Sequence, residues 1–348
     1  MRAQPIPIRP RRNAAPSPVS AREELAQQLL SRLVGQAHAI AEIVPYVQMY
    51  RAGLGPVGRP AGVFLLLGPT GTGKTRTVEA LADTLHGSEK SLLRIDCGEF
   101  QMEHEIAKLI GAPPGYLGHR ETPPLLTQQK LGAVTSEASH LALVLFDEIE
   151  KAAPSMTRLL LGVLDKALLR LGDNTSVNFE NTLIFLTSNL GASAMRKEVL
   201  PDFGFGAAAP ASHGGTPRKL SSIGLAAVKR RFSPEFVNRI DAVITYQPLD
   251  TDALEVILDQ QIAALEQHIA HRLDDQAFTL DLEMSARSFL LAKGTSREYG
   301  ARELKRVILR KLTQPLAAMV ETGLIPPESV VRVAQGDADQ LILSVVEN

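Results

Sequence analysis

Residues 61–78 read AGVFLLLGPTGTGKTRTV, and this stretch decides the fold. The apolar run at 63–67 predicts a buried strand, and the helical spacing of apolar residues at 75–85 predicts a helix behind it. The loop between them consists of Gly68, Pro69, Thr70, Gly71, Thr72, Gly73, Lys74 and Thr75. Strand, glycine-rich loop and helix in this order form the context in which backbone N–H groups and a helix N-terminus bind phosphates. The sequence therefore predicts a site for a nucleoside triphosphate.

Two residues of this loop have predicted roles of their own. Lys74 is placed to reach the β- and γ-phosphates, and the Thr75 hydroxyl is placed to coordinate Mg²⁺. The alternative is a glycine-rich turn that matches the pattern by accident. The strand and the helix on either side argue against that alternative.

Polar residues follow two further apolar runs. The run at 141–146 ends in Asp147 and Glu148, and the run at 183–187 ends in Ser188 and Asn189. In a parallel sheet these ends lie on the phosphate side, where Asp147 would hold the magnesium shell and Glu148 would orient and polarise the attacking water. Asn189 could hydrogen-bond the water or the γ-phosphate. The alternatives are solvated charges at a strand end and an ordinary turn-forming Asn.

Composition limits the class of protein. Lys and Arg number 37 and Asp and Glu number 38, and this balance argues against a general nucleic-acid binder. The one cysteine, Cys97, excludes an internal disulfide framework and a cysteine-based zinc site, and it reads as a small buried residue. The sequence contains no apolar stretch of the roughly 20 residues that a membrane span needs and no secretory signal, so we expect a cytoplasmic protein without a membrane partner.

The order of patterns predicts an α/β fold with a second, smaller domain. We expect a basic, proline-rich, disordered tail and a lead-in helix at 1–31, the helix covering 21–33, although the tail could also be a partner-binding arm or a transit peptide. Alternating strands and helices at 32–247 predict a large domain with a parallel sheet between helices. Long helices at 250–272 and 300–322, with short strands near 278–282, 330–333 and 341–346, predict a mostly helical small domain at 248–348.

Several ordered motifs resemble those of the AAA+ ATPases. Besides the phosphate loop, LFDEIEK at 145–151 and TSNLG at 187–191 are arranged as in that family. RID at 94–96, LIGAPPGYLG at 109–118, SPEFVNRID at 233–241 and YGARELKR at 299–306 resemble the Clp unfoldases more narrowly. The second ATPase module of the double-ring members, such as ClpB, ClpA and ClpC, is the most similar. The resemblance starts near residue 34, so we expect a single module that forms a single ring.

The resemblance implies further site residues. Arg239, in the SPEFVNRID motif, would reach the γ-phosphate in the neighbouring subunit, whereas the alternative is a helix-end arginine paired with Asp241 or Glu235. Arg302 would contact the nucleotide from the small domain and couple it to domain rotation. Val34 and Gly35 would contact the adenine.

Two loops carry the expected partner contacts. In the family the loop at 111–118 projects into an axial pore, so Tyr116, with Leu117 beside it, is the candidate contact for polypeptide, although a Tyr in such a loop can also pack on its own domain. The following 119–124 and the region 166–176 depart from the family pattern. Phe203-Gly204-Phe205 resembles the element that docks a Clp-type peptidase, and Ile223-Gly224-Leu225 is a second candidate that we expect to belong to a helix.

Taken together, the residues and the resemblance predict an ATP-dependent protein unfoldase. It would use ATP and Mg²⁺, assemble as a homo-oligomer, a hexamer, and thread unfolded polypeptide, with a peptidase as a further partner. One alternative is a nucleic-acid motor or loader. The balanced charge and the aromatic loop at 111–118 argue against it. We expect the one basic cluster of the chain, at 229–231, to face the subunit interface. The other alternative is an assembly factor that binds ATP without hydrolysing it. The residues that argue against it are the intact Lys74, Glu148, Asn189, Arg239 and Arg302.

Overall fold

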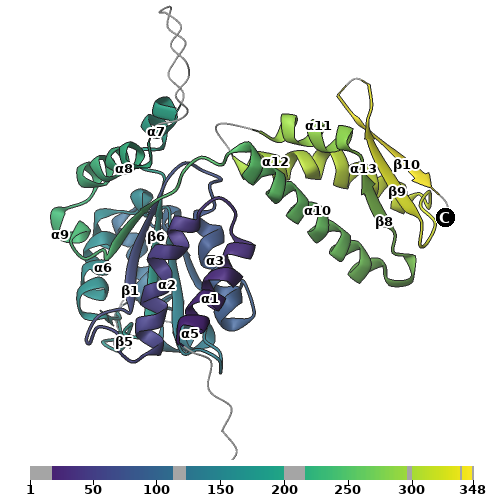
Figure 1. Cartoon of the computed structure of the whole chain (residues 1–348). Coiled ribbons are helices and arrows are strands. Elements are labelled where there is room, and N and C mark those ends of the chain that lie inside the picture. Colours follow the sequence, from purple (N-terminus) through teal and green to yellow (C-terminus); the bar gives the residue numbers. More distant parts are fainter. Residues whose placement is uncertain (1–17, 113–122, 200–215, 296–299, 338, 347–348) are drawn as a thin grey trace, which may run out of the picture.

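The computed structural model describes residues 18–112, 123–199, 216–295, 300–337 and 339–346. Figure 1 shows a larger body built around one sheet and a smaller body beside it, joined where a long helix begins. This architecture confirms the predicted fold class, an α/β core with a smaller helical part that carries short strands. The division into domains at 32–247 and 248–348 stays a prediction.

The larger body contains a five-stranded sheet in the order β2-β3-β6-β1-β7. Its strands are β1 (Gly62–Leu67), β2 (Leu93–Asp96), β3 (Ala142–Asp147), β6 (Thr182–Ser188) and β7 (Ala242–Thr245), and all neighbours pair in parallel. Every residue of β1, β3 and β6 is buried, which is why these strands read as continuous apolar runs. Because the strands are parallel, the segments that follow β1, β3 and β6 leave the sheet at one edge.

Helices cover both faces of this sheet. One face packs against α1 (Pro18–Arg32), α2 (Ala37–Arg51) and α3 (Lys74–His86), through side chains such as Phe64 and Phe185. The other face packs against α4 (Ile106–Ile110), α5 (Gln128–Ala133), α6 (Pro154–Lys166), α8 (Pro217–Arg231) and α9 (Pro234–Val237). Helix α7 (Ala192–Val199) lies against α8 (Figure 1). The lead-in helix begins at Pro18, three residues earlier than the apolar pattern predicts.

Short elements complete the larger body. The 3-10 turns η1 (Cys97–Glu99) and η2 (Glu103–Glu105) follow β2, and η3 (Ile149–Lys151) follows β3. Cys97 is buried as predicted, and burial raises the pKa of its thiol. The region 166–176 contributes to an antiparallel hairpin of β4 (Leu168–Arg170) and β5 (Ser176–Asn178), whose turn donates the Gly172 N–H to Ile110 O at 2.8 Å. The second docking candidate, 223–225, lies inside α8, where Gly224 is buried.

The smaller body begins with the long helix α10 (Thr251–Leu273), whose N-terminus is capped by the Asp250 side chain. The turn η4 (Asp274–Gln276), strand β8 (Thr279–Leu282) and helix α11 (Met284–Gly294) follow. Helix α12 (Ala301–Ile308), the π-helical turn η5 (Leu309–Thr313) and α13 (Gln314–Glu321) form one continuous helical stretch. Strands β9 (Val330–Gln335) and β10 (Leu341–Val346) complete a sheet in the order β10-β9-β8. In the described part of the chain no helix is long and apolar enough to cross a membrane.

Candidate functional site

The glycine-rich loop is fixed against the last strand of the sheet. Gly68 has φ 147°, and a Cβ at this position would lie 2.7 Å from Tyr246 O, so the close approach requires glycine. Tyr246 is fully buried, and its hydroxyl donates to Thr77 Oγ1 at 2.7 Å. Strand β1, helix α3 and the end of β7 therefore hold the two ends of the loop in place.

Lys74 points back into the loop that it terminates. Its ammonium donates to Gly68 O at 2.7 Å, to Pro69 O at 2.8 Å and to Asn189 Oδ1 at 2.9 Å. Burial lowers the pKa of this ammonium to about 8, against the opposing effect of nearby carboxylates, of which Glu150 is the strongest. The cation is thus held among acceptors at the position where phosphate oxygens would bind.

Asp147 lies at the same edge of the sheet as the loop. Its carboxylate accepts hydrogen bonds from the Thr187 hydroxyl and from the Arg94 guanidinium, and only 9% of the residue is exposed. Asp147 and Thr75 line one pocket together with the loop. Mg²⁺ at phosphate sites keeps several of its water ligands and takes only a few oxygen ligands from the protein. One carboxylate and one hydroxyl beside the phosphate loop can supply them. The donor set therefore fits Mg²⁺.

Glu148 has the backbone conformation of a left-handed turn, with φ 57° and ψ 48°. A positive φ is uncommon for a residue with a Cβ and is found at functional sites. The Glu148 N–H donates to Thr187 Oγ1 at 3.0 Å, and its carboxylate forms an ion pair with Lys151. The same carboxylate accepts from Asn189 Nδ2 at 3.4 Å. Asn189 consequently touches both Lys74 and Glu148, which brings together three residues that the sequence separates by up to 115 positions.

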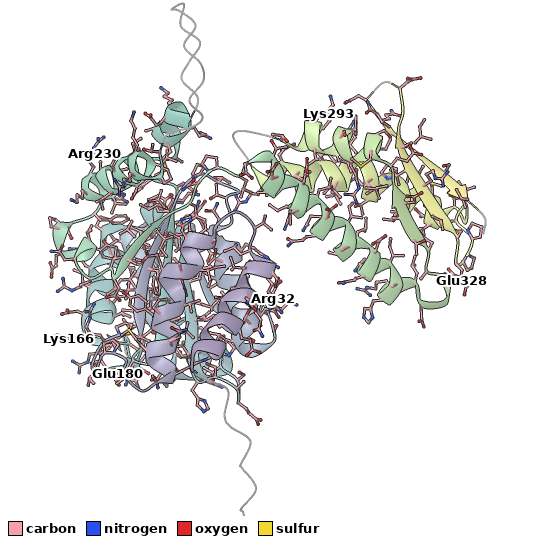
Figure 2. The ribbon with its side chains drawn as sticks, in the orientation of Figure 1. Arg32, Lys166, Glu180, Arg230, Lys293 and Glu328 are labelled. Atoms are coloured by element: carbon pink, nitrogen blue, oxygen red, sulfur yellow. The ribbon has the colours of Figure 1, made fainter. Side chains whose placement is uncertain are left out.

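The smaller body closes the other side of this pocket. Arg302 and Ala301 of α12 line it, and the Ala301 N–H donates to Gly71 O at 3.3 Å. From α10 and the preceding linker come apolar and amide side chains: Leu249, Ile257, Gln260 and Gln261. Val34 lines the pocket as well, and Gly35, with φ 76°, lies against Leu249. Figure 2 shows Arg32, another lining residue, on the side of the larger body that faces the smaller one.

The structure adds residues that the sequence did not single out for the site. Gln36 is fully buried, and its amide donates to Thr72 O at 3.2 Å and to Gln247 O at 2.9 Å. It therefore ties the phosphate loop to the linker before α10. Glu150 accepts the Asn189 N–H at 3.0 Å through Oε1. The one signal in the sequence that could have pointed to Gln36 is its position directly after Val34 and Gly35, the residues expected at the adenine.

Arg239 does not line the pocket of its own chain. It follows α9 and precedes β7, so it lies at the sheet edge opposite to the phosphate loop. Its guanidinium pairs with Asp165 at 3.4 Å and with Glu235 at 3.2 Å. The pairing with Glu235 is the local contact that the sequence offered as an alternative, while Asp241 pairs with Arg59. Tyr116, Leu117 and Phe203-Gly204-Phe205 lie outside the described residues.

Comparison with known proteins agrees with this geometry. A family model described as the AAA domain (Cdc48 subfamily) matches residues 59–243, and one described as the C-terminal, D2-small domain of ClpB protein matches residues 249–333. The chaperone protein ClpB of Enterococcus faecalis is 36% identical over 319 residues, which cover 92% of this chain and 34% of that protein. ClpB of Rhodopseudomonas palustris is 39% identical over 304 residues, covering 86% of this chain and 32% of that protein. The chain thus spans about a third of the length of the curated relatives it matches.

A solved structure shows the same fold. A closed-state cryo-EM reconstruction of Hsp104 with ATPγS and FITC casein superimposes with a TM-score of 0.78 at 28% identity, covering 96% of this chain and 53% of that one. The match extends over both bodies and the pocket between them. With its phosphate loop, its polar strand ends and the smaller body described above, the chain belongs to the AAA domain family and is similar to the second ATPase module of ClpB.

Proposed function

We propose that the chain is an ATP-hydrolysing module that assembles into a ring and unfolds proteins by drawing polypeptide through its centre. One observation carries the proposal. Lys74, Asp147, Glu148 and Asn189 meet at one edge of the sheet, and Arg302 of the smaller body lines the same pocket. A nucleotide bound there would touch both bodies, so its hydrolysis can change their relative orientation.

Each residue has a role that its position supports. The loop 68–75 and Lys74 would bind the phosphates, and Val34 and Gly35 would contact the adenine. Thr75 and Asp147 would hold Mg²⁺, which supplies charge neutralisation at the phosphates. Glu148 would polarise the attacking water and take its proton, and the Asn189 amide would keep that carboxylate in place.

Arg239 would complete the site of a neighbouring subunit. It lies at the edge opposite to its own phosphate loop, so a ring in which that edge faces the next subunit would bring it to a nucleotide. A guanidinium delivered in this way stabilises charge in the transition state, an effect of roughly 10³–10⁵ in rate in enzymes that use one. We propose that the ring is a hexamer, as the resemblance of the sequence motifs to the Clp unfoldases implies.

The polypeptide substrate is proposed from the same relatives. The Hsp104 reconstruction contains FITC casein, and the relatives reported above are named as chaperones. Tyr116 and Leu117 would contact the polypeptide substrate. The protein would act in the cytoplasm, where ATP is available. Docking of a Clp-type peptidase through Phe203-Gly204-Phe205 stays a prediction.

The test measures ATP hydrolysis at increasing protein concentration, with and without casein, for the wild type, Tyr116→Ala and Glu148→Gln. We expect activity that appears with assembly, rises with casein and falls to a small, measurable residual rate in Glu148→Gln. Tyr116→Ala is expected to keep the basal rate and lose the rise with casein. A wild-type rate that casein leaves unchanged would overturn the polypeptide assignment.

A further inference from the structure

Arg231, the last residue of α8, contacts the loop that follows the catalytic strand end. Its Nε and Nη2 donate to Glu150 O at 3.1 and 2.7 Å, and Nη2 also donates to Ala152 O at 3.2 Å. These three hydrogen bonds come from a charged donor and hold the carbonyl of Glu150, in the short turn η3, and that of Ala152, directly after the turn. The turn is therefore attached to the end of a helix that lies 81 residues after Glu150 in the chain.

The turn that Arg231 holds carries two contacts to the pocket. Glu148, directly before η3, has the left-handed conformation described above, and the Lys151 N–H donates to Glu148 O at 2.9 Å. The Glu150 carboxylate accepts the Asn189 N–H at 3.0 Å. Fixing the Glu150 and Ala152 carbonyls consequently fixes the backbone from which Glu148 projects, and through Glu150 also the backbone of Asn189.

The other side of Arg231 leads toward Arg239. The Arg231 guanidinium lies 5.9 Å from the centre of the Phe232 ring, and Phe232 stacks on Phe236 at 5.1 Å between centroids. The Arg239 N–H donates to Phe236 O at 3.2 Å. One packed series of residues thus connects the turn after Glu148 with the segment that carries Arg239.

We propose that Arg231 is a positioning residue for ATP hydrolysis. It fixes the positions of Glu148 and Asn189 relative to the segment that carries Arg239. The inference rests on the proposed function, because it acts through the assigned role of Glu148. When a neighbouring nucleotide engages Arg239, a shift of α8 and α9 would be transmitted by Arg231 to the turn that carries Glu148 of the same subunit. A connected series is only a route, so the coupling itself must be measured.

Arg230 provides the matched control. It is exposed, stands next to Arg231 on the same helix turn, and Figure 2 shows it on the outer side of α8. Arg230→Ala removes the same charge from the same helix end without removing a hydrogen bond to η3. We measure kcat and KM for ATP, affinity for a non-hydrolysable ATP analogue, and the thermal midpoint, at a protein concentration that gives all variants the same assembly by light scattering.

We expect Arg231→Ala to lower kcat by about 10- to 100-fold, as displacement of a catalytic group by about 1 Å does, with KM and analogue affinity within about twofold. Arg231→Lys, which can reach one carbonyl, should recover part of kcat, and Arg230→Ala should match the wild type. In a Glu148→Gln background Arg231→Ala should cause no further loss, because Arg231 acts through Glu148.

The inference is overturned if Arg231→Ala keeps the kcat of Arg230→Ala, or if its loss is as large in the Glu148→Gln background as in the wild type. If Arg231→Ala does not fold, an Arg231→Lys variant with a wild-type thermal midpoint and unreduced kcat overturns it equally. A Glu148→Gln variant with unreduced kcat would instead refute the proposed role of Glu148. The two failures are therefore distinguishable.

Discussion

At the scale of single residues, the site depends on charges and glycines in places where few other side chains fit. Lys74 is a cation held by the carbonyls of Gly68 and Pro69 and the amide of Asn189, with a pKa lowered by burial to about 8. Phosphate binding must compete for this ammonium. Its protonation state therefore matters to nucleotide affinity within an accessible range of pH.

ATP affinity should fall as pH rises above about 8. Below that value Lys74 is charged with or without nucleotide; above it, binding must first restore the proton, because a bound phosphate raises the pKa of the lysine. By linkage the dissociation constant rises by up to about tenfold per pH unit. Isothermal titration calorimetry with a non-hydrolysable analogue at pH 7 to 10 measures it. Lys74→Arg, which keeps its charge, should flatten the dependence, and an equal slope in both proteins would contradict the account.

Gly300 should be essential for the contact between the smaller body and the phosphate loop. It has φ 50°, and a Cβ there would lie 2.9 Å from Gly71 O. Gly323 is the matched control, since it has φ 67° and no atom within 4 Å of a Cβ. Both alanine variants should lose about 1 kcal/mol of stability through the positive φ. Only Gly300→Ala should raise KM for ATP, and a similar KM in both variants would show that the contact is dispensable.

Sequence reasoning located the residues whose position follows from a strand end. Asp147, Glu148 and Asn189 stand at the ends of apolar runs, and the loop that ends in Lys74 follows another such run. Parallel pairing brings these strand ends together. Glu150, Gln36 and Arg231 could not be found in this way. Their importance comes from hydrogen bonds to backbone groups 36 to 211 residues away, which no local pattern encodes.

At the scale of elements, the linker between β7 and α10 is attached to the phosphate loop. Gln36 precedes α2 and bonds to both, and the Gln247 N–H donates back to Gln36 Oε1 at 3.4 Å. A fully buried amide with its donors satisfied stabilises one arrangement of three segments. The sequence indicated this linker only as the boundary that it predicts between residues 247 and 248.

Gln36→Glu should loosen this connection. The substitution keeps the size of the side chain and removes the two donors, so the carbonyls of Thr72 and Gln247 face a carboxylate oxygen. A buried carbonyl that loses its donor costs about 1–3 kcal/mol, which lowers the thermal midpoint by roughly 2–10 °C. Gln27→Glu, at an exposed position of α1, is the control and should melt like the wild type. Equal midpoints in the two variants would count against a role for Gln36.

The fold at this scale was predictable in outline and not in detail. The strands, their parallel arrangement and the two long helical stretches of the smaller body follow from apolar periodicity. Helix α11 and the β4–β5 hairpin were not predicted. Each of the strands β4 and β5 has three residues, of which only the middle one is buried. A pattern this short cannot be distinguished from that of a loop.

At the scale of the whole molecule, the pocket lies between two bodies, and Arg239 lies at the opposite edge of the larger one. Within one chain Arg239 has acidic partners, Asp165 and Glu235, that neutralise it. In a ring it would exchange those partners for a neighbour's γ-phosphate. Hydrolysis would then be a property of the assembly, and this is the central claim of the proposed function.

The most direct test of that claim mixes two inactive variants. Lys74→Ala removes phosphate binding and keeps Arg239, whereas Arg239→Ala keeps the pocket and removes the residue offered to the neighbour. If subunits assemble at random in equal amounts, half of the intact pockets face an intact Arg239, so the mixture should recover about a quarter of the wild-type ATPase rate. A mixture no more active than the sum of its two components, with subunit exchange confirmed by fluorescence energy transfer, would contradict a site completed by the neighbouring subunit.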